Sequence, residues 1–486
     1  MKCEPTIATP SGRTEASPAP GALALVVLLT GAFLSPLDYF IVNLALPAIQ
    51  SGLHASSAQL QLMVSLYTSA FAVLLVTGGR LGDQFGRKRM FMAGMAGFVA
   101  ASLLCACAPN GTVLVAGRIL QGGSAAVMVP QILATIRAVF PKAQQTKVMS
   151  LYGFVFGFAS VVGQIGGGAL ITLRPFGLGW QSIFLINVPV GLAALFGAWR
   201  LVPENRPEHR ARLDLGGLFC LLLSLALVIY PLTAGREAGW PAWTLVAFAA
   251  SVPAFALFLW VEAKLRRQGA DPLVDLGMFR NPVFSLGLVL AFCFYCDSAF
   301  FLTYGVYLQD GLHWSPLAAG LAIFPFGVGA IIGPLNSPRI VRHAGHHVLT
   351  IGFALLATGF AVAIGMLWHR ASPSPVFYLG LLVAGIGHGL VLPSVVRVVI
   401  GEIEPARAGV ASGVVTSMLQ IGSAFGATAI GGVFFSAVLP GDGATGYARA
   451  FQAGMSVVVV LFAVCTLLAF ALVRQHALAS RHAEVA

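Results

Sequence analysis

Asp38 and Asp297 are acidic residues set deep inside long apolar segments, and they occupy equivalent places in two halves of the chain. The sequence QSGLHAS follows Asp38 at residues 50–56, and QDGLHWS follows Asp297 at residues 309–315, with one common offset of 259 residues. A carboxylate in the hydrocarbon core of a membrane costs roughly 3 kcal/mol or more, so such residues usually serve ion or substrate pathways. Two of them in register across an internal repeat therefore indicate a membrane transporter.

Two further ionisable residues, Arg118 and His388, also fall well inside apolar segments. Histidine titrates near neutral pH, which suits proton exchange, although His388 could equally satisfy a backbone carbonyl within its Gly-His-Gly sequence. Arg118 could take part in proton transfer or simply neutralise Asp38, because a buried charge normally requires a partner. An offset of 263 residues carries Arg118 onto Leu381, so we expect the carboxylate of Asp297 to lack an arginine partner and to attract a cation.

The composition excludes an ordinary soluble protein, because 58% of the residues are hydrophobic, only 9% are charged and the mean hydropathy is +0.87. A membrane-spanning helix needs about 20 mostly apolar residues. Such stretches begin near residues 22, 58, 91, 113, 148, 182, 214, 242, 283, 315, 348, 375, 408 and 451. We therefore predict an all-α polytopic membrane protein with 14 transmembrane helices, in which Asp214, Asp310 and Arg397 lie near helix ends.

The net charge of +11 does not indicate nucleic-acid binding, because the basic residues follow the topology of the expected helices. With the N-terminus inside, all 28 lysines and arginines lie in inner loops or tails except Arg118 and the outer-loop residues Arg174, Arg236, Arg370 and Arg449. This positive-inside pattern predicts that both termini are cytoplasmic. Residues 1–20 are rich in Pro, Ser, Thr and Ala and are expected to form a disordered cytoplasmic tail.

The internal repeat divides the chain into two six-helix halves. Gly86 matches Gly345 at the offset of 259 residues, and Gly122 matches Gly385 at an offset of 263. We predict an N-terminal half at 21–203, two inserted linker helices at 204–268, a C-terminal half at 269–474 and a cytoplasmic tail at 475–486. Parallel six-helix halves related by an axis along the membrane normal resemble the architecture of major facilitator transporters.

The sequence GRLGDQFGRKR at residues 79–89 lies in the loop between the second and third expected helices. It resembles the signature loop of the major facilitator superfamily. Its glycines permit a tight turn, and its basic residues suit the inner surface of the membrane. The resemblance implies a conformational gate that steadies one state of the transporter, formed by Gly79, Gly82, Asp83, Gly86 and Arg87.

Three more motifs narrow the family. The sequences LDYFIVNLALP at 37–47, RILQG at 118–122 and IFLINVPVG at 183–191 resemble the 14-helix drug:proton antiporter family (EmrB/QacA-like). In this superfamily the first helix of each three-helix unit lines the central cavity. The resemblance therefore implies that the substrate cavity contains Asp38, Asp297 and His388, and that proton coupling depends on these residues together with Arg118.

One motif departs from the family pattern. The fifth expected helix carries Gly163, Gln164, Gly166 and Gly167, where the antiporters normally have a Gly-Pro pair before the last glycines. The glycines allow close helix contact, whereas Gln164 removes the bend that a proline would cause. The departure weakens the indication of export over import that this motif gives.

These patterns predict a proton-driven antiporter, not an enzyme, that exports amphipathic, cationic or multidrug-type small molecules by alternating access. The alternative is a proton-coupled importer or symporter of a small metabolite on the same fold. No cofactor or metal is expected, because a proton gradient drives transport and Cys293 and Cys296 are interpreted as packing residues. The expected location is a bacterial inner (plasma) membrane, and the expected partners are substrate, protons and the lipid bilayer. A periplasmic adaptor leaves no recognisable pattern in the sequence.

Overall fold

The computed structural model describes residues 22–485 except 141, 205–213, 270–271, 275, 369, 402–407, 440 and 442. The expected disordered tail at 1–20 lies outside the described residues. Over the described ranges the chain folds into helices joined by short connections, and no strand occurs among them. The backbone of residues 475–485, which the sequence assigns to a tail, continues the last helix.

Helix ends in the first part of the chain are set by capping residues and glycine. The backbone N–H of Gln59 donates to Ser56 Oγ at 3.2 Å, and the N–H of Ser56 donates to Gln59 Oε1 at 3.0 Å. Gly86 has a φ of 105°, a conformation that favours glycine, and it makes the turn between the second and third helices. The elements of this part are α1 (Ala22–Leu53), α2 (Ser57–Phe85), α3 (Arg87–Ala106), α4 (Gly111–Val139), α5 (Lys142–Leu173), η1 (Pro175–Gly177), α6 (Ser182–Leu185) and α7 (Asn187–Leu201).

Two helices that pack against each other follow, α8 (Leu215–Glu237) and α9 (Ala242–Arg267), and α8 also packs against α2. The first elements after them are η2 (Leu276–Arg280), α10 (Pro282–Tyr295), α11 (Ser298–Val306), η3 (Tyr307–Gly311), α12 (Pro316–Ala322), α13 (Phe324–Ala344) and η4 (Gly345–His347). The last elements are α14 (Val348–Met366), α15 (Pro375–Gly401), α16 (Ala408–Phe425), η6 (Gly426–Ile430), α17 (Gly431–Ala437) and α18 (Ala444–Val485).

Among the described residues, 13 helical segments are long and apolar enough to cross a membrane. Some of these spans join several elements: Pro282–Gly311 contains α10, α11 and η3, and Gly413–Ala437 runs from α16 through η6 to α17. The remaining expected span corresponds to α5, a helix of 32 residues whose described apolar stretch, Gly157–Leu173, is shorter. The all-α polytopic membrane fold is therefore confirmed.

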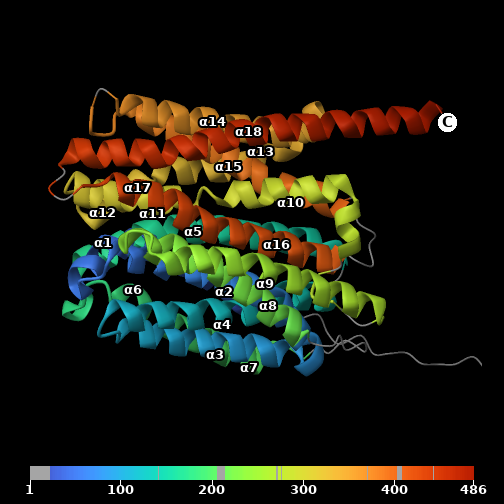
Figure 1. Ribbon diagram of the computed structural model, residues 1–486. Helices are drawn as coiled ribbons and strands as arrows, with labels where there is room; N and C mark the ends of the chain where they lie inside the picture. The colour runs from blue at the N-terminus through green and yellow to red at the C-terminus, as the bar shows by residue number, and fades with distance from the viewer. Residues whose placement is uncertain are drawn as a thin grey trace, which may run out of the picture.

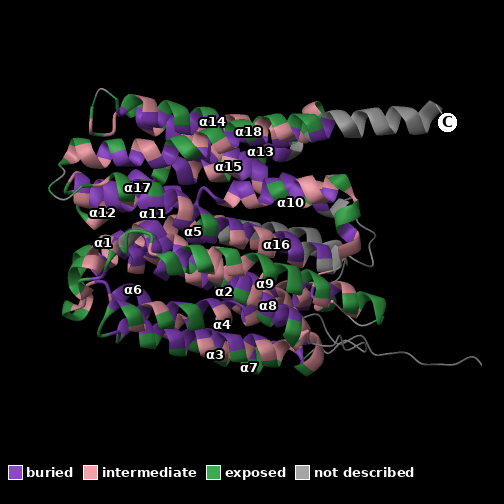
Figure 2. Cartoon of the chain, viewed as in Figure 1, coloured by how far each residue is buried: buried purple, intermediate pink, exposed green. Residues whose placement is uncertain are grey.

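Figure 1 shows α3, α4 and α7 along one side of the bundle and α14, α15 and α18 along the other, with α1, α5, α10 and α11 between them. Helices pack extensively within each side: α2 and α3 pack on α4, and α13 and α14 pack on α15. Buried residues face the interior of the bundle, and the outer faces carry exposed residues (Figure 2). Large apolar side chains such as Phe196, Leu245 and Leu467 are among the exposed ones, which suits helices that contact lipid tails.

The two sides of the bundle pack closely at the end opposite residues 79–89, and we call this the sealed end. There α1 contacts α11, and α5 contacts α12. Gln309 Nε2 donates to the carbonyl oxygen of Leu44 at 2.8 Å. Gly320 in α12 approaches α5 so closely that a Cβ there would lie 2.5 Å from the carbonyl oxygen of Gln164. Such close backbone contact leaves no room for a passage between these helices.

Candidate functional site

A cavity lies between the two sides of the bundle and contains about 680 Å³ of space not filled by atoms, part of it continuous with the outside. Its wall is built from α1, α2, α4 and α5 on one side and from α10, α11, α15 and α16 on the other. Small-molecule sites of membrane and soluble helical proteins commonly occur between helices in this way. The cavity is therefore the candidate site.

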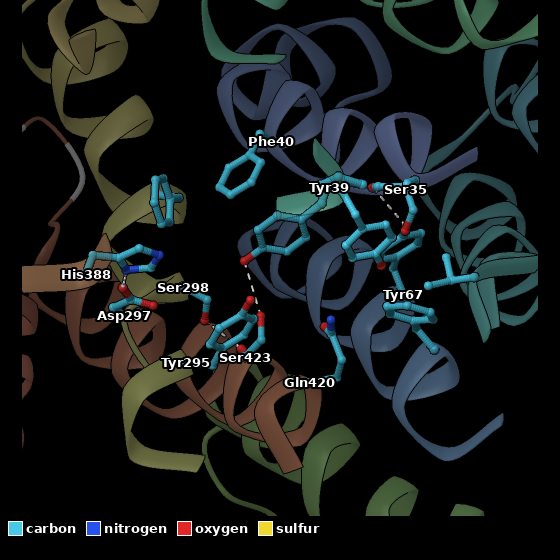
Figure 3. A pocket seen from close by; sticks show the side chains of 16 residues that line it. Ser35, Tyr39, Phe40, Tyr67, Tyr295, Asp297, Ser298, His388, Gln420 and Ser423 are labelled. Atoms are coloured by element: carbon cyan, nitrogen blue, oxygen red, sulfur yellow. Dashed lines mark hydrogen bonds and ion pairs between the residues drawn. The ribbon is translucent and has the colours of Figure 1, made fainter. Parts of the chain in front are cut away.

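Aromatic side chains are the largest group of residues on the cavity wall (Figure 3). They come from both sides of the bundle and comprise Tyr39, Phe40, Tyr67, Phe71, Tyr152, Tyr295 and Phe301. Uncharged polar groups are fewer and comprise Ser35, Ser298, Gln420 and Ser423. The hydroxyls of Tyr39 and Ser423 lie 3.2 Å apart and join α1 to α16. Rings with a few hydroxyls and an amide suit a molecule with an apolar body and scattered hydrogen-bonding groups.

Asp297 and His388 lie on the cavity wall and contact each other. His388 Nδ1 is 2.8 Å from Asp297 Oδ2. Asp297 is 3% exposed and sits in the break between α10 and α11, where the N-terminal end of α11 favours a negative charge. The ring of His388 packs against Phe294 and Phe326, with centroid distances of 4.7 and 5.4 Å. The contact is an ion pair only when the imidazole is protonated.

Among the described residues no arginine pairs with Asp297, but the expectation that its carboxylate is without any partner is wrong. The repeat comparison pointed to Leu381 as the place for one, and Leu381 is fully buried. The actual partner, His388, lies seven residues further along α15. Seven residues are about two helical turns, so both positions lie on nearly the same face of the helix. The repeat offset of 263 residues therefore identified the correct face of α15 but the wrong position along the axis of that helix.

Asp38 is completely buried among polar side chains from α3, α4 and α7. Arg118 Nη1 donates to Asp38 Oδ2, while Gln121 Nε2 and Asn187 Nδ2 donate to Oδ1 at 2.7 and 2.9 Å. Arg118 Nη1 also donates to Gln121 Oε1 at 2.6 Å, and Arg118 Nε donates to the carbonyl of Met63 at 3.2 Å. The carboxylate thus has a cation and two amides around it, as a charge removed from water requires.

Arg118 and Asp38 form an ion pair, but both lie behind the cavity wall. Neither residue lines the cavity, although the adjacent Tyr39 does. Consecutive helical residues point in different directions, so the neighbour of a buried Asp38 can face the cavity. Tyr67 connects the two regions: it lines the cavity, and the guanidinium carbon of Arg118 lies 4.1 Å from the centroid of its ring.

The polar cluster is completed by three residues that were not among those predicted from the sequence, Gln121, Asn187 and Ser102. Ser102 Oγ accepts from Gln121 Nε2 at 2.9 Å and from Asn187 Nδ2 at 3.3 Å. A signal was present, because Gln121 belongs to RILQG and Asn187 to IFLINVPVG. Each motif that resembles the antiporter family therefore contributes a polar side chain to the cluster around Asp38.

The expected gate residues lie together at the end of the bundle opposite the sealed end. Arg87 Nη2 forms an ion pair with Asp83 Oδ1 at 3.2 Å, and Arg87 Nη1 donates to the carbonyl of Ala134 in α4 at 3.0 Å. Gly82 packs directly on the side chain of Gln131, which in turn donates to the carbonyl of Gly78 at 2.7 Å. The turn after α2 is thereby fixed to α4.

The glycines of α5 differ in how closely they approach the neighbouring helix α1. A Cβ at Gly163 would lie 2.9 Å from the carbonyl oxygen of Leu37, and a Cβ at Gly167 would lie 2.7 Å from Cγ1 of Ile41, so α5 packs tightly on α1 there. Gly166 has no neighbour closer than 4.0 Å. Gln164 is 4% exposed, and α5 continues past it without a break.

Comparison with known proteins identifies a family. Two segments, residues 28–427 and 288–484, match the model of the Major Facilitator Superfamily. The chain is 37% identical to a probable actinorhodin transporter of Streptomyces coelicolor over 87% of its length and 74% of the relative's. It is 33% identical to the tetracenomycin C resistance and export protein of Streptomyces glaucescens, covering 88% of this chain and 78% of that one. It is 35% identical to a puromycin resistance protein of Streptomyces alboniger, covering 83% and 79%.

Solved structures share the fold at low sequence identity. A proton-dependent oligopeptide transporter matches with a TM-score of 0.66 and 15% identity, covering 93% of this chain and 98% of that one. A nucleoside transporter matches with a TM-score of 0.64 and 13% identity, covering 93% and 99%. These likenesses concern the arrangement of the helices.

Proposed function

Because the chain belongs to the major facilitator superfamily, we propose that it is a proton-driven antiporter that exports amphipathic, cationic or multidrug-type small molecules. It is a multi-pass membrane transporter and not an enzyme. The names of two relatives, a tetracenomycin C resistance and export protein and a puromycin resistance protein, support export as the direction. The departure at Gln164 does not favour import, because α5 makes the same kind of close contact on both sides of it.

The observation that carries the proposal is the cavity wall, in which aromatic rings surround the contacting pair Asp297 and His388. The rings provide apolar surface for the body of a substrate. A carboxylate at the wall supplies the attraction for a positive group, and this attraction is larger in a poorly hydrated cavity than in water. When His388 is protonated the pair is neutral overall, so a cation and the His388 proton compete for the same carboxylate.

Proton coupling for every substrate is assigned to Asp38 and Arg118. Protonation of Asp38 would leave Arg118 without its counter-ion, which changes the cost of keeping the pair buried. Tyr67 lies against Arg118 and also faces the cavity. A substrate that displaces Tyr67 therefore alters the surroundings of Arg118, and through Arg118 the affinity of Asp38 for a proton. An inward proton gradient, worth about 2.3 kcal/mol per charge per 100 mV in its electrical part, would then drive efflux.

We further propose that the end carrying residues 79–89 is cytoplasmic and that the protein lies in a bacterial inner membrane. The distribution of lysine and arginine supports this orientation. The Asp83–Arg87 pair and the contact of Arg87 with α4 are assigned to the gate that steadies one conformation. The residues from 21 to 203 and from 269 to 474 are taken as the two moving halves, with α8 and α9 as an insertion between them.

Everted membrane vesicles test the direction of transport. With an imposed gradient that is acidic inside, protons leave through the cytoplasmic face, and an exporter must accumulate substrate in the lumen. Vesicles with Asp38→Asn serve as the control for leak. Substrate loss from the lumen under the same gradient would contradict export and favour a symporter, which moves substrate together with protons.

A further inference from the structure

A second cluster of carboxyl groups lies far from the cavity, where α8 and α9 meet the connection to η2. Leu273 of this connection is 1% exposed and forms a small apolar core with Cys220 of α8 and Phe258 of α9. Val76 of α2 packs against the same core. The connection between the inserted helices and the second half of the chain is therefore held against helices of the first half.

Polar contacts fix the same connection at two further points. Glu262 in α9 is fully buried, and its Oε2 accepts from the backbone N–H of Val274 at 2.9 Å. Arg80 of the gate sequence donates to the carbonyl of Pro272. The connection is thus bound to α9 through Glu262 and to α2 through Arg80, two residues apart along the chain.

The remaining oxygen of Glu262 faces a second carboxyl group. Asp214 caps α8, because its Oδ1 accepts from the backbone N–H of Gly217 at 2.7 Å. Asp214 Oδ2 and Glu262 Oε1 both crowd against Gly217, and a Cβ at that position would overlap each of them. Such a Cβ would lie 2.2 Å from Asp214 Oδ2 and 2.4 Å from Glu262 Oε1, so the two oxygens are close neighbours on either side of that position. Among the described residues, no donor reaches either of these two oxygens, although both are buried.

Two neighbouring buried carboxyl oxygens that no described donor reaches disfavour ionisation of both groups, since like charges repel strongly in a buried site. One proton between them provides the missing hydrogen bond and leaves a single negative charge. Arg80 is the described cation that acts on Glu262, so a cluster with one shared proton is electrically balanced. A monovalent cation in place of the proton would leave the same net charge, so charge balance alone does not distinguish the two and the experiment below is designed to do so.

We propose that Asp214 and Glu262 bind one proton between them, which forms a proton-binding site outside the cavity at the root of the inserted helices. The shared proton holds α8 to α9, and Glu262 in turn holds the connection to the second half. Loss of the proton places two negative charges on either side of Gly217 and loosens this junction next to the gate sequence. The site is independent of any proton taken up at Asp38 or His388.

Infrared spectroscopy of the purified full-length protein at neutral pH tests the site directly, because a protonated carboxyl group has a C=O band that ionised carboxylates lack. The measurement uses an Asp38→Asn/Asp297→Asn background, which removes the carboxyl groups of the first cluster and the cavity. We expect a C=O band that shifts in heavy water and that is lost in both Glu262→Gln and Asp214→Asn. These two variants keep the side-chain size and supply an amide donor to the partner, and either one suffices if the other expresses poorly.

Glu204→Gln is the matched control, because Glu204 lies at the same end of the bundle and pairs with Arg89 at 3.7 Å. The band should persist in this variant. A band that is unchanged by both Glu262→Gln and Asp214→Asn overturns the proposal. A band that arises only when sodium and potassium are replaced by choline also overturns it, since the site would then hold a metal cation. Neither result bears on the direction of transport or on the cavity.

Discussion

The guanidinium carbon of Arg118 lies 4.1 Å from the ring centroid of Tyr67, and the same tyrosine lines the cavity. Arg118 also donates to the buried carboxylate of Asp38. A cation over an aromatic ring is worth about 2 kcal/mol where water is excluded. Tyr67 therefore contacts the buried ion pair through Arg118 and also faces the cavity.

Two substitutions of Tyr67 distinguish the role of its ring from the role of its hydroxyl. Tyr67→Leu removes the surface on which Arg118 rests, and we expect transport to become uncoupled, with a rate that no longer rises with the pH gradient. Tyr67→Phe keeps the ring and loses only the contact of the hydroxyl with Ser35, so coupling should remain within about threefold of normal. Substrate flux at several imposed gradients measures this. Equal loss in both variants would mean that the hydroxyl, and not the ring, is the important group.

Asp38→Asn should abolish proton-driven transport of all substrates while the protein still reaches the membrane. The amide keeps the size of the side chain but cannot take up a proton, and it leaves Arg118 as a buried cation without a counter-ion. Arg118→Gln should also fail, because removing one partner of a buried pair costs about 3–5 kcal/mol. The double variant should recover folding and downhill exchange, though not proton-driven accumulation. Thermal unfolding and exchange assays on the three proteins check this, and an additive loss of stability in the double variant would argue against a direct pair.

Two adjacent glycines of α2 provide a matched test of the packing that supports the gate. A Cβ at Gly78 would overlap the backbone carbonyl of Ala126, whereas a Cβ at Gly79 has no neighbour closer than Pro130 at 3.8 Å. Gly78→Ala should therefore lower the free energy of unfolding by about 1–3 kcal/mol, which is typical of overpacking. Gly79→Ala should have little effect. Thermal unfolding in detergent distinguishes them, and equal midpoints would contradict the close approach of α2 to α4.

Single cysteines with membrane-impermeant labels test the topology. Cysteines at positions 87 and 206 should react only from the cytoplasmic face, and cysteines at 174 and 449 only from the outer face, because of the positive-inside distribution. Position 206 lies outside the described residues, so its label also tests the insertion of α8 and α9. Outer labelling at 206 would show that the number of spans before it is odd.

Helices, repeats and motifs could be predicted because each rests on local patterns. Apolar stretches predicted where the spans begin, and the ionisable residues Asp38, Arg118, Asp297 and His388 could be recognised because charges are rare in apolar segments. The pairing of Asp297 with His388 could not be predicted, since it depends on the rotation and axial position of α15 relative to α11. The contact of Asn187 with Asp38 likewise depends on how α7 packs beside α1, although its motif marked the segment.

The proximity of Asp214 and Glu262 could not be predicted from the sequence either, for a different reason. The sequence places Asp214 near a helix end and gives no sign that Glu262 is buried beside it. Their proximity arises because α8 and α9 pack with Gly217 at the crossing point. A residue without a side chain at that place allows two carboxyl groups to meet.

The two ionisable pairs are proposed to have different roles. Asp38 with Arg118 couples the transport of every substrate to protons, whereas Asp297 with His388 favours substrates that carry a positive charge. Transport of one cationic and one neutral substrate in the same vesicles tests this difference most directly. Asp38→Asn should abolish proton-driven uptake of both. Asp297→Asn should reduce uptake of the cation at least tenfold while sparing the neutral compound, and Asp297→Glu should retain part of the cation transport. Equal loss of both substrates in Asp297→Asn would contradict the account and make Asp297 a second obligatory proton site.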